Sequence, residues 1–484
     1  MNIDHQRCYR AVEARDARFD GVFFTGVRTT GIYCRPSCSA VTPKAINVAF
    51  YATAAAAHEA GFRACRRCRP DSSPGSPEWN VRADAVGRAM QMIADGVVER
   101  DGVDGLAERL GYSTRHVTRM LTDELGAGPL AIARSGRAHT ARLLIETTSM
   151  SMTDVAFAAG FASVRQFNDT VRQVYATTPS AMRGSRGGAP GGRIAVRLAV
   201  RQPFYREGLM AFLGGRAISG VEVVDGFSYV RVVNLPRGPG VVALTLHADH
   251  VACTLELTDL ADTAVAVQRC RRLLDLDADP VAIGEVLSAD PVLAPMVAEA
   301  PGIRLPSQVS GFEVAVRAIV GQQISVAGAR TVLGRIVAAY GTPVALELAR
   351  EHGLTHAFPT ADQLSDADST TLSMPAARGR AIVGLAQAVA DGKLDLDPGA
   401  DRAGLRERLV ALPGIGPWTA GYVAMRALSD PDEMLETDLI IRRMLTQLGI
   451  DATRTDRWRP WRSYAAMYLW RQSQLQDIRQ KETP

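Results

Sequence analysis

Two close pairs of cysteines near the N-terminus constrain the fold more than any other feature of the chain. The pairs are Cys34-x3-Cys38 and, after a gap of 26 residues, Cys65-x2-Cys68. A fold that brings them together creates a tetrahedral site of four thiolates, which is a typical ligand set for zinc. We therefore predict one zinc ion at this site. A disulfide framework is not expected in a reducing compartment, and three scattered cysteines are predicted to be small buried side chains: Cys8, Cys253 and Cys270.

Length and pattern divide the chain into several parts. A chain of 484 residues is too long for one hydrophobic core, and typical domain sizes predict three or four domains. Residues 72–77 and 184–192 are rich in Gly, Pro and Ser and are predicted linkers. Between them the sequence predicts short amphipathic helices. From residue 194 alternating apolar residues predict strands up to about residue 260, and helical spacing predicts helices from about residue 264 onward. The predicted fold class is multidomain α+β.

Composition places the chain among cytoplasmic proteins. Hydrophobic residues make up 47% of it and charged residues 22%, and no apolar run is long enough to cross a bilayer. The start, MNIDHQRCYR, lacks the apolar core of a signal peptide. Residues 1–193 contain 25 basic and 18 acidic residues, against 30 and 33 in the remainder. This basic excess fits a polyanionic partner such as nucleic acid, but an ordinary solvated surface gives the same excess. Sequence motifs are needed to distinguish the two.

Residues 105–125 predict a helix-turn-helix. The turn is expected at Gly111, and the second helix is expected to begin after an N-cap at Ser113 or Thr114. A second copy follows in residues 152–183, with Gly160 at its turn. The spacing of one copy is weak support for DNA binding because many helical hairpins bind no DNA. Two copies joined by a helix are more specific.

The segment LPGIGPWTA, within residues 409–427, predicts a hairpin between two helices. Gly414 and Gly416 would let backbone N–H groups approach a DNA phosphate closely, and the N-terminus of the following helix would add a favourable dipole. Asp438 stands 20 residues after Trp418. Alone, an aspartate before Leu-Ile would be an ordinary helix cap. A carboxylate at this distance beyond such a hairpin resembles the arrangement in the helix-hairpin-helix glycosylase superfamily, and this resemblance makes Asp438 a candidate catalytic carboxylate.

The cysteine region resembles a known family of repair proteins. The runs FTGVRTTGIYCRPSCSA and GFRACRRCRPD are similar to the N-terminal zinc domain of the Ada family, over about residues 4–72. The resemblance implies that Cys34 is both a zinc ligand and the acceptor of a methyl group from a methylated DNA phosphate. Methylation would reduce the charge of the centre from −2 to −1 and so tighten DNA binding. Neighbouring arginines could hold the DNA backbone or face water: Arg28, Arg35, Arg63, Arg66, Arg67 and Arg69.

The middle segment resembles an AraC-type DNA-binding domain. The resemblance rests on the two helix-turn-helix copies, on Gly160-Phe161 before the second recognition helix, and on the closing TPSAMR. It implies that each second helix presents side chains to a major groove, with phosphate contacts or free surface as the alternatives. The residues concerned are Ser113, Thr114, Arg115, His116, Arg119, Ser163, Arg165, Gln166 and Asn168.

Residues 194–484 resemble the AlkA family of 3-methyladenine DNA glycosylases. Besides LPGIGPWTAGY, the matching runs are FEVAVRAIVGQQISVAGA and WRPWRSYAAMYLW. The resemblance implies that Asp438 stabilises the positive charge that builds on the sugar as the N-glycosidic bond breaks. Trp418, Tyr422 and Trp470 would stack on the cationic base, with core packing as the alternative. The hairpin residues Pro413, Gly414, Ile415 and Gly416 would contact DNA.

Departures from related enzymes sharpen these expectations. Members that also nick the strand have a lysine where this chain has Trp418, so a monofunctional enzyme is expected. No cysteine follows Cys270, so no iron–sulfur cluster and no cofactor are expected for the glycosylase. Leu439 stands where the family has tyrosine, which leaves the preferred base open. The loop of Gln322, Gln323 and Ile324 is expected to enter the gap left by the flipped base, with Gln323 in place of the family's apolar wedge.

The resulting domain hypothesis has five parts. They are an Ada-type zinc domain (1–76), an all-α double helix-turn-helix domain (78–183), a linker (184–193), a mixed α/β subdomain (194–305) and an all-α helix-hairpin-helix glycosylase (306–484). The chain would be a methyl-sensing transcriptional activator fused to a glycosylase. One alternative is a transcription regulator with an inactive C-terminal domain, and another is a glycosylase with a purely structural zinc ribbon. A second methyltransferase of the Ada type is not expected because no Pro-Cys-His-Arg motif occurs.

The same hypothesis fixes the expected partners. They are double-stranded DNA that contains alkylated bases and methylphosphotriesters, promoter DNA and RNA polymerase. We expect a monomer, located in the cytoplasm at the nucleoid, with no membrane partner.

Overall fold

The computed structural model describes residues 4–70, 85–183, 193–307 and 309–482. The chain divides into two compact units, one of Met1–Ala199 with Leu235–Gly238 and Val251–Gln268, the other of Val200–Asn234 with Pro239–His250 and Arg269–Pro484. The predicted linkers at 72–77 and 184–192 lie outside the described residues. The fold is multidomain α+β, as the sequence predicted.

The N-terminal part is a small sheet flanked by short helices. Its strands run in the order β3-β1-β2-β4, where β1 is Phe24–Val27, β2 is Ile32–Cys34, β3 is Val48–Tyr51 and β4 is Arg63–Ala64. Strand β1 is antiparallel to β2 and β3, whereas β2 and β4 are parallel. The helices are α1 (His5–Glu13) and α2 (Ala54–Glu59), with short 3-10 turns at Ala17–Phe19 and Ala45–Asn47. Because β2 and β4 are parallel neighbours, their carboxyl ends reach the same edge of the sheet.

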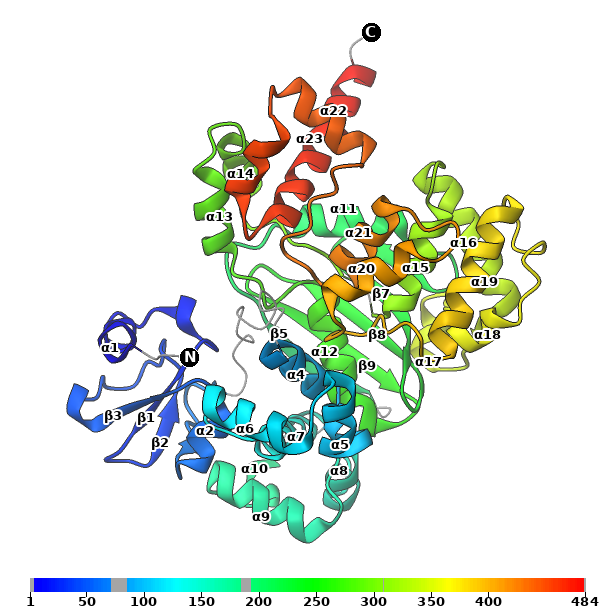
Figure 1. Ribbon diagram of the computed structural model, residues 1–484. Helices are drawn as coiled ribbons and strands as arrows, with labels where there is room; N and C mark the ends of the chain where they lie inside the picture. Colours follow the sequence, from blue (N-terminus) through cyan, green and yellow to red (C-terminus); the bar gives the residue numbers. More distant parts are fainter. Residues whose placement is uncertain (1–3, 71–84, 184–192, 308, 483–484) are drawn as a thin grey trace. The chain divides into compact units, whose positions relative to one another are not determined.

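Helices form the described residues 85–183 of the next part (Figure 1). They are α4 (Ala85–Ala94), α5 (Val97–Leu110), α6 (Thr114–Leu125), α7 (Pro129–Thr147), α8 (Met152–Ala158), α9 (Val164–Tyr175) and α10 (Pro179–Arg183). Local signals set the two helix-turn-helix turns. Gly111 and Gly160 have positive φ angles of 75° and 83°. Ser113 and Ser163 then cap α6 and α9 by accepting from backbone N–H groups three residues on.

A five-stranded sheet follows at the positions where alternating apolar residues predicted strands. Its order is β5-β9-β8-β7-β6. The strands are β5 (Ile194–Ala199), β6 (Glu222–Asp225), β7 (Ser228–Leu235), β8 (Gly238–Leu246) and β9 (His250–Leu257). Helix α11 (Arg206–Arg216) lies between β5 and β6 in the chain, and a 3-10 turn (Leu260–Asp262) leads into α12 (Thr263–Leu273).

The remainder is almost entirely helical. Its helices are α13 (Pro280–Ser288), α14 (Ala294–Glu299), α15 (Gly311–Val320), α16 (Val326–Tyr340), α17 (Glu347–Glu351), α18 (Ala361–Ser365), α19 (Ala376–Ala390), α20 (Arg402–Val410), α21 (Pro417–Ala427), α22 (Leu439–Gln447) and α23 (Arg462–Glu482). A 3-10 segment, η6 (Ala452–Trp458), precedes α23. Two-residue strands β10 (Thr342–Pro343) and β11 (His356–Ala357) pair with each other. Helix α15 is the centre of the core because it packs against both α19 and α21.

Charged side chains are buried beside this core. Arg231 on β7 forms ion pairs with Glu222 at 3.2 Å and Glu313 at 2.8 Å, and Arg317 binds the same two glutamates. Burial disfavours the charged form of Glu222, but the two arginines outweigh it and lower the pKa of its carboxyl to about 2. Each charge therefore has an opposite partner, and these pairs link β6 and β7 to α15.

Candidate functional sites: a four-cysteine centre and a carboxylate held by indoles

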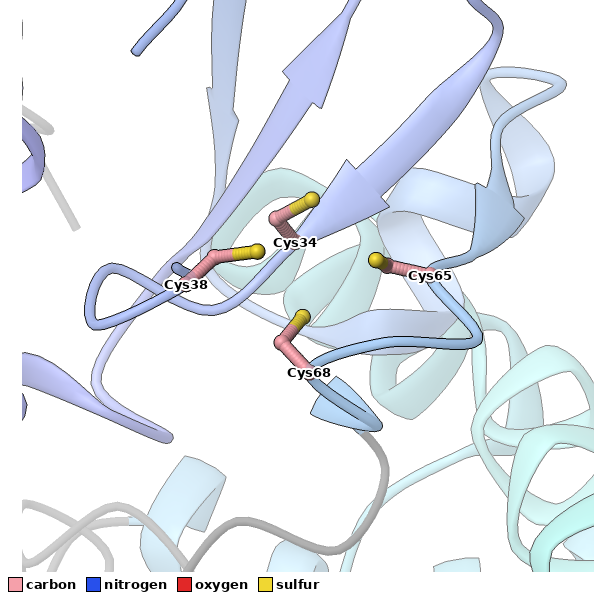
Figure 2. A group of neighbouring side chains, drawn as sticks. All are labelled: Cys34, Cys38, Cys65 and Cys68. Carbon is pink, nitrogen blue, oxygen red and sulfur yellow. The ribbon is translucent and has the colours of Figure 1, made fainter. Parts of the chain in front are cut away.

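The four predicted cysteines come together at one edge of the small sheet. Their sulfur atoms all lie within 4.8 Å of one another, and Figure 2 shows the four side chains turned toward a common point. Four sulfurs at the usual bond length around one zinc ion would lie about 3.8 Å apart, so the cluster fits zinc with little movement. Cys34 and Cys38 are half-buried, whereas Cys65 and Cys68 are buried.

A buried aspartate fixes the loop between Cys34 and Cys38. Asp20 accepts hydrogen bonds from the backbone N–H of Ser37 at 3.0 Å and from its hydroxyl at 2.6 Å. The same carboxylate pairs with Arg35 at 3.4 Å. Sequence reasoning missed Asp20 because its partners lie 15 and 17 residues away and no local pattern marks it. Arg35, predicted to touch DNA, is thus also part of the support for the cysteine loop.

A cavity of about 180 Å³ opens beside the cysteines. Cys34, Cys38 and Cys65 line it together with apolar side chains such as Val27 and Val41. A small uncharged group could therefore reach the sulfur of Cys34 through apolar surroundings.

Two of the arginines that flank the cysteines contact the helical part of the same unit. Arg66 donates to the backbone carbonyl of Ala176, the residue that ends α9, at 3.0 Å. Arg69 pairs with Glu146 on α7 at 2.9 Å. Arg67, by contrast, is exposed. Among the described residues, Arg66 and Arg69 have such contacts and Arg67 has none, so the charge of Arg67 faces solvent.

The side chains predicted to enter a major groove lie at the N-caps and in the first halves of α6 and α9. Arg115, Arg119 and Arg165 are exposed, while His116 is half-buried and stacks on Tyr112 with ring centroids 4.8 Å apart. Others take part in local hydrogen bonds: Ser113 and Ser163 as helix caps, Thr114 as a donor to Asp104, and Gln166 as an acceptor from Ala162. Asn168 is half-buried.

The predicted hairpin joins α20 to α21. Gly414 has a φ angle of 86°, and a Cβ there would lie 2.8 Å from the Cβ of Ala381, so both the backbone angle and the space favour glycine. Gly416 caps α21 and Ile415 is buried, while Pro413 and Gly414 are exposed. Exposed backbone at the start of α21 is suited to a phosphate.

Asp438 caps helix α22 and also accepts two indole N–H bonds. Its Oδ1 accepts from the backbone N–H groups of Ile440 and Ile441, both at 3.0 Å. Trp418 on α21 donates its Nε1–H to Oδ2 at 2.9 Å, and Trp470 on α23 donates to Oδ1 at 3.2 Å. The side chain is 8% exposed. The capping interpretation is therefore true, but it accounts for only half of the contacts.

Tyr422 lies between the two tryptophans. Its ring stacks on Trp418 with centroids 5.3 Å apart and lies 6.4 Å from Trp470. Its hydroxyl accepts a hydrogen bond from Arg426 at 2.8 Å. Burial raises the pKa of this phenol, but the positive charges of Arg426, Arg216 and Arg317 outweigh it, and the net shift is downward.

Exposed side chains lie at the start of α22 and in the loop between α15 and α16. Leu439, next to Asp438, is 79% exposed, and Ile440 is also exposed. Gln323 has a φ angle of 56° and is exposed, with the exposed Ile324 beside it. The preceding residue, Gln322, donates to the carbonyl of Gly414 at 3.1 Å and so ties this loop to the hairpin.

Comparison with known proteins gives the family. The profile of the metal binding domain of Ada matches residues 7–71, a helix-turn-helix domain profile matches 106–185, and the AlkA N-terminal domain profile matches 195–310. A protein of Mycobacterium tuberculosis (strain CDC 1551 / Oshkosh), named probable bifunctional transcriptional activator/DNA repair enzyme AlkA, is 52% identical over 97% of both chains. The chain belongs to this bifunctional AlkA family.

Two further relatives each match a different half of this chain. DNA-3-methyladenine glycosylase 2 of Escherichia coli (strain K12) is 32% identical over 55% of this chain and 94% of its own length. The bifunctional transcriptional activator/DNA repair enzyme Ada of the same organism is 33% identical over 35% of this chain and 47% of its own length. The bifunctional AlkA family thus joins an Ada-type regulatory half to a glycosylase half. Within the described residues, none of the helices combines the length and hydropathy needed to span a membrane.

Proposed function

We propose that this chain is a methyl-sensing transcriptional activator joined to a monofunctional DNA glycosylase that excises alkylated bases such as 3-methyladenine. The observation that carries the glycosylase is the buried carboxylate of Asp438, bound by an indole from the helix that follows the Gly-Ile-Gly hairpin. The names of the relatives from M. tuberculosis and E. coli support the same activity.

Asp438 would act on the sugar. When the C1′–N bond breaks, its electron pair leaves with the base and positive charge remains on the sugar, which a carboxylate beside C1′ stabilises. A water molecule then adds to C1′ and releases a proton to solvent. A cationic base is already a good leaving group, so no acid is needed to protonate it. The aromatic faces of Trp418, Tyr422 and Trp470 would favour such a base by stacking and cation–π attraction.

The surrounding loops would hold the DNA. The exposed backbone of Pro413–Gly416 would bind one phosphate at the start of α21. Gln323 would enter the gap that the flipped nucleotide leaves in the duplex. Since Trp418 occupies the position of the lysine in strand-nicking enzymes, the chain would release bases without cutting the strand.

Base release from DNA treated with dimethyl sulfate tests the glycosylase. We expect the full chain to release methylated purines and the Asp438→Asn variant to release them at least about a hundredfold more slowly. Asp451→Asn is the matched control, because Asp451 caps η6 in the same way, accepting from Thr453 at 2.8 Å, away from this site. No base release by the unaltered chain, or full release by Asp438→Asn, would instead favour a regulator with an inactive C-terminal domain.

Cys34 would accept methyl groups at the other site. A bound zinc ion keeps the cysteine sulfurs deprotonated at neutral pH. The sulfur of Cys34 attacks the methyl carbon of a methylphosphotriester, the S–C bond forms as the C–O bond breaks, and the phosphate leaves as an anionic diester. Its partial exposure and its place in the wall of the apolar cavity support this choice. The thioether is stable, so each chain would react once.

Mass spectrometry after exposure to methylphosphotriester DNA tests the acceptor. We expect one added methyl group on the peptide that contains Cys34, and none on the peptide that contains the buried Cys253, which serves as the internal control. No methyl group on Cys34 would leave the cysteine centre as a purely structural zinc site.

Promoter binding would connect the sensor to transcription. The exposed Arg115 and Arg165, at the starts of α6 and α9, would contact promoter DNA, and Arg35 and Arg67 would contact DNA next to the cysteines. The parts concerned are the zinc domain (1–76), the DNA-binding domain (78–183), the linker (184–193), the α/β subdomain (194–305) and the glycosylase (306–484). The chain would act as a monomer in the cytoplasm at the nucleoid and would recruit RNA polymerase.

A further inference from the structure

The carboxylate of Asp438 accepts four N–H groups, and they are unevenly divided between its oxygens. Oδ1 accepts three, from Ile440, Ile441 and Trp470, and Oδ2 accepts one, from Trp418. A carboxylate offers about two acceptor positions on each oxygen. Among the described residues, therefore, Oδ1 is fully occupied and Oδ2 alone keeps room for another contact.

We propose that Trp418 and Trp470 are positioning residues whose indole N–H groups lock the Asp438 carboxylate so that Oδ2 faces the anomeric carbon. This inference rests on the proposed glycosylase and assigns both tryptophans a function separate from stacking on the base. The backbone N–H groups of α22 alone leave Oδ2 free to turn. The indole of Trp418 fixes the plane of the carboxyl group, and that of Trp470 holds Oδ1 on the helix side.

The indole of Trp418 is itself held rigidly. One face of the ring stacks on Tyr422 at an interplanar angle of 20°, and the hydroxyl of Tyr422 is bound by Arg426. Arg426 is 1% exposed, lies over the same tyrosine ring and donates to the backbone carbonyl of Ser307 at 3.2 Å. A rigid donor places the carboxylate before the reaction begins, so no reorganisation is needed as charge develops on the sugar.

Three helices converge on this one carboxylate. Trp418 comes from α21, Asp438 precedes α22 and Trp470 comes from α23. A residue that only stacks on the base would discriminate between bases, because stacking and cation–π attraction depend on the charge and size of the base. A residue that only orients the carboxylate would affect every lesion equally, because the sugar is the same in all of them.

Substitution of tryptophan by phenylalanine separates the two functions, because phenylalanine keeps an aromatic face and lacks the N–H group. The variants are Trp418→Phe and Trp470→Phe in the full chain. Trp458→Phe is the matched control, since the indole of Trp458 also donates to a carboxylate, that of Asp290 at 3.1 Å, outside this site. Single-turnover rates would be measured on duplexes with 7-methylguanine, which is cationic, and with hypoxanthine, which is neutral.

We expect each site variant to lower the single-turnover rate by about ten- to a hundredfold, the cost of one hydrogen bond to a charged group. The factor should be the same for both lesions, with little change in the Kd for DNA that carries an abasic site. Trp458→Phe should keep the rate of the unaltered chain at temperatures where it remains folded. Melting temperatures measured in parallel separate loss of fold from loss of orientation.

Two outcomes would overturn the inference. The first is a rate within twofold of the unaltered chain for both site variants, and the second is a loss that falls on the cationic lesion alone, which is the pattern of a stacking residue. Failure of the unaltered chain to release either base is a different result, because it would refute the proposed glycosylase itself.

Discussion

Asp438 has two functions in the structure, helix cap and candidate catalyst, and two substitutions should separate them. Asp438→Ala removes the acceptor of the backbone N–H groups of Ile440 and Ile441. Loss of an N-cap costs about 1 kcal/mol, and loss of the negative charge at the helix start adds a few tenths of a kcal/mol. Asp438→Asn keeps an amide oxygen that caps nearly as well. Both variants lose the negative charge that the proposed mechanism places beside the sugar.

Hydrogen exchange in the full chain measures the cap. If exchange at the start of α22 occurs by local opening, a loss of about 1 kcal/mol speeds it about fivefold. We therefore expect the peptide that covers residues 439–447 to exchange about fivefold faster in Asp438→Ala and nearly normally in Asp438→Asn. Base release from methylated DNA should be lost in both.

Either of two results would contradict these two functions of Asp438. Unchanged exchange in Asp438→Ala would mean that the cap contributes nothing to α22. Base release by Asp438→Asn close to that of the unaltered chain would mean that the carboxylate charge is not used. Asp451→Ala is the control for the cap, because it should speed exchange at η6 and leave base release unchanged.

Three further predictions concern stability. Arg231→Met leaves the buried Glu222 and Glu313 with one arginine fewer and should cost about 3–5 kcal/mol, seen as a lower melting temperature of the unit that contains α15; an unchanged melting temperature would contradict the ion-pair assignment. Burial raises the pKa of Glu433 to about 7, against the attraction of Arg406, so its contribution to stability is present below its unfolded pKa and is lost as pH rises through 7. Glu433→Gln should therefore flatten the fall in melting temperature between pH 5 and 8, and an unaltered slope would count against it. Removal of metal with a chelator should make residues 4–70 sensitive to protease while residues 309–482 stay resistant, and equal resistance of both would exclude a metal-supported fold.

Local signals explain why much of the fold could be predicted. Gly111 and Gly160 have the positive φ angles that glycine tolerates best, and Ser113 and Ser163 cap the helices that follow. These interactions lie within three or four residues of each other, so the sequence contains all of their partners. The cysteine cluster was predictable for a related reason, since two short spacings leave few ways to arrange four ligands around one ion.

Interactions between distant residues could not be predicted in this way. Glu222 and Glu313 are separated by 91 residues, and each looks in the sequence like an ordinary surface charge. Their burial follows from β6 and β7 lying against α15, which places Arg231 between them. Asp20 is a similar case, because its partner Ser37 is distant in sequence and close only in the folded sheet.

The tryptophans of the carboxylate site show the same limit. A tryptophan in a sequence suggests a large aromatic face, and that property led to the expectation that Trp418 and Trp470 stack on a base. The N–H group of an indole finds its acceptor only when α21, α22 and α23 pack together, and the acceptor found here is Asp438. The N–H bond points outward from the edge of the indole ring, whereas the faces lie above and below its plane. One tryptophan can therefore stack on a base and orient the carboxylate at the same time. The two tryptophans would then contact the damaged base through their ring faces and act on the sugar through the carboxylate of Asp438, which their N–H groups hold.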